Sequence, residues 1–162
     1  MVKLIRKISN GTDKVTMVLA CVFMTVVVVS SALQVFTRYV LNASLSWTEE
    51  CCRYCFIWAS MMGAAVAYKR GSHVALDIIS GRLKGKVKSA QIIVSDVLVI
   101  AFCVILICYS PAILKLTMRQ LSTAMRIPMV AFYVSIPLGA LDIVVHAVAN
   151  LLETITGHKA TT

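Results

Sequence analysis

The stretch from Gln34 to Asp77, QVFTRYVLNASLSWTEECCRYCFIWASMMGAAVAYKRGSHVALD, decides how this chain folds. Its first half is rich in charged and aromatic residues, and its second half is apolar up to the basic pair at 69–70. The order Ser-Trp-Thr-Glu at positions 46–49 is typical of a capping box, in which a hydroxyl and a carboxylate bind the first free amides of a helix. The stretch therefore predicts a helix that begins near Ser46, at a polar boundary, and then enters an apolar environment.

Charged and aromatic side chains recur at helical spacing around this predicted helix start. Arg53 follows Glu49 by four residues and Glu50 by three, so the three side chains can meet on one helical face. Negative charge in the first turn also suits the helix dipole. We predict an interfacial cluster that is structural or forms a subunit interface, consisting of Arg38, Trp47, Glu49, Glu50, Arg53, Tyr54 and Trp58.

The composition places this stretch in a membrane. Of the 162 residues, 59% are hydrophobic and only 14% are charged, and the mean hydropathy is +0.86. A water-soluble domain of this size has too little interior to bury so much apolar surface. The net charge is +9, but the basic residues gather in a tail and a loop, as membrane topology requires, so nucleic acid is not an expected partner. We expect one integral membrane domain over residues 1–162, in contact with membrane lipids.

Four apolar stretches are candidate membrane spans, and the first, of about 22 residues, is long enough to cross a hydrocarbon core of ~30 Å at about 1.5 Å per residue. In lipid these stretches must be helical to satisfy their amides. We therefore predict an all-α fold with a short interfacial helix at 72–80 and four transmembrane helices at about 15–36, 51–68, 90–114 and 128–152.

Prolines and small residues add local detail to these spans. Pro128 suits the first turn of the last span, and Pro137 with Gly139 should bend it. In the second span, Ala59 and Gly63 belong to a row of small residues at four-residue steps, which lets another helix approach closely.

Lysine and arginine counts set the predicted orientation. Ten fall in the tail 1–14, expected at the membrane surface, and in the loop 69–89, and Lys159 adds an eleventh, against five on the opposite side. The positive-inside rule then puts both termini in the cytoplasm. The outer crossing at 115–127 contains no acidic residue, so lipid phosphate or an acidic partner should compensate its basic residues, Lys115, Arg119 and Arg126.

Six cysteines raise the alternative of a membrane thiol oxidoreductase, with Cys52-x-x-Cys55 as its outward-facing pair. That chemistry needs a second outward pair to pass electrons on, whereas Cys21, Cys103 and Cys108 lie inside predicted spans. Cysteine also fills apolar space in helices, and we favour this interpretation. The three histidines do not pair at one depth, so haem is not expected, and we predict neither a metal nor another cofactor.

Two other pairs of polar residues are notable, one within the fourth span and one at the inner surface. Asp142 lies within the fourth span with His146 one turn on, and an intramembrane carboxylate is a functional hypothesis by default. A lone carboxylate on four spans is a thin basis for an ion pathway, so we expect it to bind a partner in this chain or in another subunit. His73 and Asp77 share one helical face at the inner surface, but two ligands do not make a zinc site.

A family pattern joins several of these residues. The run R-Y-x(7)-W-x-E-E-x-x-R-Y-x-F-x-W, from Arg38 to Trp58, is followed by G-A-A-x-A at 63–67 and by G-x-H-x-x-x-D at 71–77. This combination resembles the small membrane subunit of tripartite ATP-independent periplasmic (TRAP) transporters. It covers about a quarter of the chain, and the cysteines at 51, 52 and 55 are not part of it.

The resemblance implies an accessory role and no catalysis. Such subunits form a stable heterodimer with a large membrane subunit that binds sodium and moves the substrate, and a periplasmic binding protein delivers the substrate transiently. Family substrates are small organic anions, including C4-dicarboxylates and sialic acids, which are imported across the bacterial inner membrane on the sodium gradient. The small subunit is similar to a scaffold, and Lys115, Arg119 and Arg126 are its predicted docking site for the binding protein.

Overall fold

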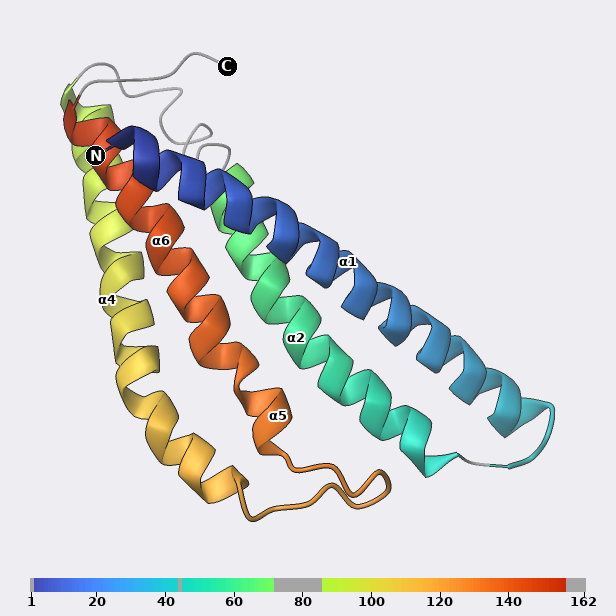
Figure 1. Cartoon of the computed structure of the whole chain (residues 1–162). Helices are drawn as coiled ribbons and strands as arrows, with labels where there is room; N and C mark the ends of the chain where they lie inside the picture. The colour runs from blue at the N-terminus through green and yellow to red at the C-terminus, as the bar shows by residue number, and fades with distance from the viewer. Residues whose placement is uncertain (1, 44, 72–85, 157–162) are drawn as a thin grey trace.

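In the computed structural model the chain is helical throughout, apart from its connecting loops and one isolated bridge between Leu121 and Pro128, over the described residues 2–43, 45–71 and 86–156. The all-α class is therefore confirmed. Figure 1 shows the five helices of this part of the chain, α1 (Val2–Tyr39), α2 (Ser46–Gly71), α4 (Lys86–Thr117), α5 (Val130–Tyr133) and α6 (Ser135–Thr156).

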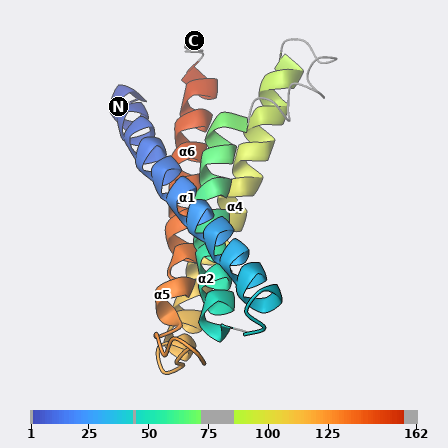
Figure 2. The same cartoon turned by 90° about the vertical axis from the view of Figure 1, so that its right-hand side faces the viewer.

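Helices α2 and α6 form the centre of the bundle. α1 packs mainly along α2, α4 packs along α6, and α2 and α6 contact each other. Figure 1 shows this order across the molecule, and Figure 2 shows α1 crossing the other helices at an angle. The outer faces of α1 and α4 carry many exposed large apolar side chains, such as Val22, Phe36, Leu98 and Phe102.

Three helical stretches are long and apolar enough to cross a membrane, namely Ser9–Tyr39, Ala90–Thr117 and Val130–Leu152. They correspond to the first, third and fourth predicted spans. The predicted second span lies in α2, a helix of 26 residues that is more polar because Arg53, tyrosines and small residues replace aliphatic ones. The chain is thus a multi-pass helical membrane protein, and the membrane position of α2 remains a prediction.

The first helix differs from expectation at its start. The tail 1–14 was expected to lie apart at the membrane surface, but α1 is one continuous helix of 38 residues. Ser9 and Asp13, within that predicted tail, are buried against other helices. At about 1.5 Å per residue α1 is roughly 57 Å long, so it must tilt or project beyond a bilayer of about 40–45 Å.

The last predicted span is interrupted near its start. Pro128 lies before the helix instead of opening it, and α5 ends at Tyr133 before α6 begins at Ser135. Pro137 has no N–H to donate to the Tyr133 carbonyl, which explains the interruption one turn earlier. Helical bonding resumes where the amide of Leu138 donates to the carbonyl of Val134 at 3.3 Å.

Candidate functional site

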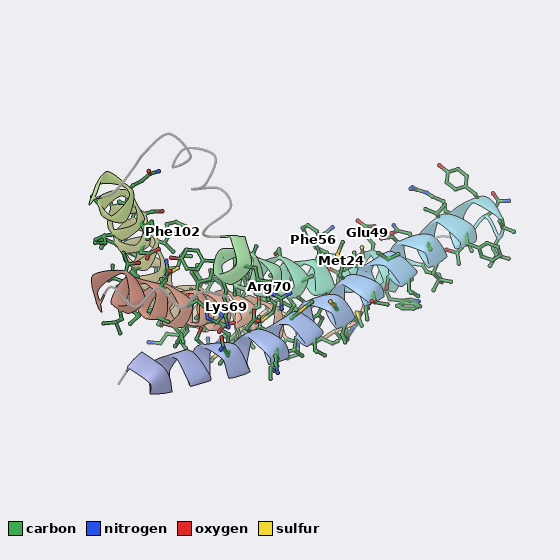
Figure 3. All side chains as sticks on the ribbon, turned by 90° about the horizontal axis from the view of Figure 1, so that it is seen from above. Met24, Glu49, Phe56, Lys69, Arg70 and Phe102 are labelled. Atoms are coloured by element: carbon green, nitrogen blue, oxygen red, sulfur yellow. The ribbon has the colours of Figure 1, made fainter. Side chains whose placement is uncertain are left out.

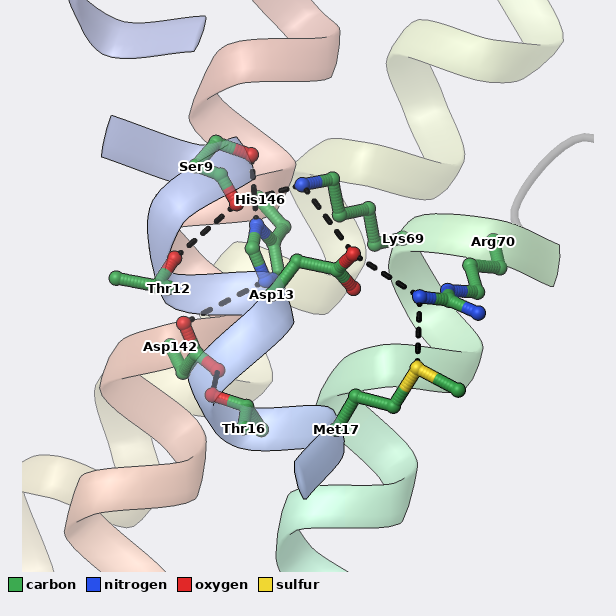
Figure 4. A network of polar contacts seen from close by, with 9 residues as sticks. All are labelled: Ser9, Thr12, Asp13, Thr16, Met17, Lys69, Arg70, Asp142 and His146. Atoms are coloured by element: carbon green, nitrogen blue, oxygen red, sulfur yellow. Dashed lines mark hydrogen bonds and ion pairs between the residues drawn. The ribbon is translucent and has the colours of Figure 1, made fainter. Parts of the chain in front are cut away.

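Polar side chains gather inside the bundle where the first half of α1 meets α6 (Figure 4). Asp142 of α6 accepts a 2.7 Å hydrogen bond from the Thr16 hydroxyl of α1, and its other oxygen lies 3.4 Å from Nε2 of His146. Nδ1 of His146 lies 2.8 Å from the Ser9 hydroxyl. Asp142 and His146 are buried, so these contacts fasten α1 to α6 away from water.

A second group of contacts fastens the same part of α1 to the end of α2. The carboxylate of Asp13 lies 3.3 Å from Nη2 of Arg70 and 3.9 Å from Nζ of Lys69. Lys69 also donates to the backbone carbonyl of Ser9 at 2.5 Å. The same Arg70 nitrogen lies 2.9 Å from Sδ of Met17, as Figure 4 shows. One acidic and two basic side chains therefore hold α1 and α2 together.

A third buried carboxylate joins three helices. Asp96 of α4, which is 1% exposed, accepts a 2.6 Å hydrogen bond from the Tyr68 hydroxyl of α2. Its other oxygen accepts a 2.7 Å hydrogen bond from the Asn150 side-chain amide of α6. Burial of a charge is costly unless donors compensate it, so Asp96 specifies how α2, α4 and α6 meet.

Sequence reasoning recognised only part of these contacts. The structure gives Asp142 its partner within this chain, one of the two alternatives predicted. Sequence reasoning missed the contacts that Ser9, Asp13, Thr16 and Asp96 make. Their signal was available, because a polar residue inside an apolar helix needs a hydrogen-bonding partner. What the sequence lacked was the pairing between helices.

Glu50 of α2 extends to the α4–α5 loop (residues 118–129) and does not join the predicted pair with Arg53. Its carboxylate accepts hydrogen bonds from the Ser122 hydroxyl and from the amides of Ala124 and Met125, the latter two at 3.0 Å each. The hydrogen bond from Ser122, with those from the loop amides, lowers the pKa of Glu50 below its usual range. Glu50 therefore anchors this loop in its charged form.

The anchored loop carries two of the predicted docking residues, Arg119 and Arg126, and Lys115 lies in the last turn of α4. The amide of Ser122 donates to the carbonyl of Ile127 at 3.0 Å, and Arg126 sits in the left-handed region with φ 53°. That conformation is unfavourable by roughly 1–2 kcal/mol for a residue with a side chain, so the loop's hydrogen bonds must maintain it. Lys115, Arg119 and Arg126 are all exposed. Glu50 binds the Ser122 hydroxyl and the loop amides, and not these three cations.

The rest of the predicted interfacial cluster does not form a single site. Arg53 pairs with Glu49 at 3.2 Å, and their side chains are 67% and 61% exposed in this chain. Arg38 and Trp47 are exposed. In the described part of the chain the capping box does not form either, because α2 already includes Ser46 and the Glu49 carboxylate binds Arg53.

The aromatic members of the cluster pack across helices instead. Tyr54 of α2 stacks on Phe132 of α5, with ring centroids 3.7 Å apart. Trp58 stacks on Phe23 of α1 at 5.3 Å, and its indole N–H donates to the carbonyl of Ala131 at 3.2 Å. These two rings position α5 and α1 against α2.

The close approach between helices that was expected at Gly63 occurs at another glycine in the described chain. A Cβ at Gly63 would meet nothing within 4 Å, so no helix of the described chain approaches it. The close approach lies at Gly139 of α6, where a Cβ would stand 3.0 Å from Cβ of Met61. Cys52 lies 3.1 Å from the Ser31 hydroxyl at the contact between α1 and α2.

Two predicted residues, His73 and Asp77, lie outside the described residues, as does the expected interfacial helix at 72–80. Among the residues that the structure describes, no group of three His, Cys, Asp or Glu side chains could hold a metal ion.

These features define a multi-pass helical membrane protein whose buried polar groups serve assembly of the bundle. Residues 24–157 match the family described as tripartite ATP-independent periplasmic transporters, DctQ component, and the chain belongs to this family. Its members are transporter subunits and not enzymes, so the thiol oxidoreductase alternative with Cys52 and Cys55 is excluded.

Three curated relatives illustrate the similarity. A Haemophilus influenzae protein, provisionally named a TRAP transporter small permease protein, is 22% identical over 152 residues, which is 94% of each chain. The sialic acid TRAP transporter small permease protein SiaQ of Vibrio cholerae is 30% identical over 60% of this chain and 55% of its own length. The isethionate TRAP transporter permease protein DctMQ of Oleidesulfovibrio alaskensis is 33% identical over 60% of this chain and 16% of its own length.

Proposed function

We propose that this chain is a scaffold that holds the large membrane subunit of a TRAP transporter during sodium-driven, binding-protein-dependent uptake of a small organic anion. Supporting this, Asp13, Asp96 and Asp142 each bind side chains of another helix. Polar groups used in this way fix helix positions and are not free to bind a solute. A C4-dicarboxylate and a sialic acid are the proposed substrate classes.

A stable heterodimer with the large subunit is the second part of the proposal. The exposed apolar faces of α1 and α4 offer surface for another membrane subunit. This chain also matches 16% of the much longer isethionate permease DctMQ, which supports a close association between small and large components.

For the membrane arrangement we propose four spans, with α2 as the second and both termini in the cytoplasm of the bacterial inner membrane. At about 1.5 Å per residue, the 26 residues of α2 reach about 39 Å, enough to cross. Thiol labelling tests the orientation. Ser122 is only 2% exposed, so its exposed neighbour should carry the probe. In a cysteine-free background, Thr123→Cys should react from outside and Ser89→Cys from inside, and the reverse pattern contradicts the arrangement.

The basic residues Lys115, Arg119 and Arg126 are the proposed docking site for a periplasmic binding protein with an acidic face. Their exposure and the anchored loop support this role. Lipid phosphate is the alternative partner. Charges at the rim of an interface act mainly on the association rate, so salt should slow uptake if they receive the binding protein.

Reconstitution tests the whole proposal. The chain should co-purify with a large membrane subunit when both are expressed together. Proteoliposomes that contain both subunits should take up a labelled sialic acid or dicarboxylate only with a binding protein and an inward sodium gradient. Uptake that persists without this chain, or without sodium, would contradict the proposed role or the proposed coupling, respectively.

A further inference from the structure

An apolar groove of about 500 Å³ runs between α1 and α2 on the surface of the bundle. Gly63 leaves one wall open, because a Cβ there would meet nothing within 4 Å. Figure 3 shows Met24 and Phe56 close together over the two helices and Arg70 farther along them. The lining residues are Ala20, Cys21 and Met24 from α1 and Phe56, Ala59, Ser60 and Gly63 from α2.

Each helix that forms the groove carries a basic residue on the same helical face as its groove-lining residues. Lys14 and Met17 precede Cys21 by seven and four residues on α1, and Arg70 follows Gly63 by seven residues on α2. Residues at such spacings share a helical face, so both cations lie toward the same end of the groove. The contact between Arg70 Nη2 and Met17 Sδ, at 2.9 Å, places the guanidinium over α1, one turn before Cys21.

Both cations are accessible at that end. The Arg70 side chain is 51% exposed although one nitrogen binds Asp13, and a guanidinium has further donors in a fork that matches phosphate oxygens. Lys14 is exposed as well. An apolar groove with positive charge at one end matches a phospholipid. The phosphate would lie at the cations and an acyl chain in the groove.

The dimensions agree with this ligand. Phe56 and Arg70 are fourteen residues apart on α2, which is about 21 Å at about 1.5 Å per residue. One leaflet with its headgroups is half of a bilayer of about 40–45 Å, so roughly 20–22 Å. The groove with its basic end therefore spans one leaflet.

We propose that a phospholipid occupies this groove, with an acyl chain against Met24, Phe56 and Gly63 and with its phosphate bound by Lys14 and Arg70. The lipid joins α1 to α2 along their contact, and Asp13 links the same two helices through Arg70 beside the basic end. This site does not depend on the proposed transport role.

The test uses the full-length chain, purified in detergent with any subunit that co-elutes. Phosphatidylglycerol with a photoreactive group on one acyl chain is added, and the labelled residues are mapped by mass spectrometry. We expect labels within 20–24 and 56–63. Lys14→Gln should reduce the retained lipid at least tenfold, whereas Lys88→Gln, with the same charge change on α4, should not. Gly63→Leu should abolish the labels, because its side chain fills the groove, while circular dichroism and elution volume stay unchanged.

Two further probes separate the parts of the ligand. Diacylglycerol with the same chains should be retained at least tenfold less, and inorganic phosphate should compete only weakly, since the acyl chain contributes binding. Equal retention of diacylglycerol overturns the phosphate clamp, and full competition by phosphate shows that a free anion occupies the basic end instead. Labels that survive Gly63→Leu, or crosslinks from the groove to a helix of the large subunit in place of lipid, overturn the site.

Discussion

Thr16 of α1 and Asp142 of α6 lie 126 residues apart in the chain, yet a 2.7 Å hydrogen bond joins them inside the bundle. Thr16 is 6% exposed and Asp142 is 9% exposed, so water does not replace this bond if it is lost. The first helix is therefore held in place by a side chain near the middle of the last one.

Thr16→Val should destabilise the chain by about 1–2 kcal/mol. The change keeps the side-chain shape but leaves a buried carboxylate oxygen without its donor, which costs about 1–3 kcal/mol in soluble proteins and less within membranes. Thermal unfolding in detergent measures the effect. Thr25→Val is the matched control, because the Thr25 hydroxyl is exposed and binds only its own helix, and it should change stability by under about 0.5 kcal/mol. Equal effects of the two changes would mean that the bond between Thr16 and Asp142 does not stabilise the bundle.

Gly139→Ala should be destabilising by about 1–3 kcal/mol, as overpacked cores are. The added Cβ would stand 3.0 Å from Met61 Cβ and 3.3 Å from the Met61 carbonyl oxygen, so α2 and α6 would have to separate. Gly63→Ala adds the same methyl group in open space and should be neutral or stabilising by up to about 1 kcal/mol. Chemical denaturation of the two variants measures the difference, and destabilisation by both changes would mean that helix packing at Gly139 is not the cause.

The anchor at Glu50 should release its loop in acid. Because its folded-state pKa is lowered from 4.5, the anchor is fully present above about pH 4.5 and is lost as the pH falls through the lower folded value. A spin label on Thr123→Cys, in a background without native cysteines, should be immobile at pH 7 and become mobile below about pH 4.5. Glu50→Gln should make the label mobile at every pH, whereas Glu49→Gln should leave the profile unchanged. A label in the Glu50→Gln variant that stays immobile at pH 7 would refute the anchor.

Arg53→Ala should change the stability of the isolated chain by under about 1 kcal/mol, because its pair with Glu49 is largely exposed. Unfolding of the purified chain is the measurement. Asp96→Ala provides the contrast, since it strands the Tyr68 hydroxyl and the Asn150 amide in the interior. If Arg53→Ala were as damaging as Asp96→Ala, the exposed pair would have a structural role that its position does not explain.

Arg119→Glu combined with Arg126→Glu should slow uptake when the binding protein is limiting. Reversed charges at an interface rim reduce the association rate, so excess binding protein should partly restore uptake and the complex with the large subunit should remain assembled. Uptake by proteoliposomes at low salt is the measurement. Lys3→Glu combined with Lys7→Glu, near the N-terminus, is the charge-matched control. Normal uptake by the Arg119→Glu, Arg126→Glu variant would assign these cations to lipid.

Much of the fold follows from the sequence because a bilayer restricts the choices. Long apolar runs must be helical in lipid, so the helices at 15–36, 90–114 and 128–152 were predictable to within a few residues. The extended start of α1 was not predictable. Ser9 and Asp13 are typical of a polar tail unless their partners on other helices are known. Pro137 indicated an irregularity in the last helix. The structure places the interruption one turn earlier, at Tyr133, because the Tyr133 carbonyl has no N–H of residue 137 to bind.

The sequence by itself determined the membrane class, the family and the residues able to form ion pairs. Hydropathy and local motifs depend on neighbours along the chain, and these are visible in a sequence. The tertiary structure alone decided which pairs form: Asp142 binds Thr16, Asp96 binds Tyr68, and Glu50 binds the amides near Ser122 and leaves Arg53 to Glu49. Such choices depend on how helices distant in sequence pack, because a buried carboxylate takes the donors that packing brings within about 3 Å.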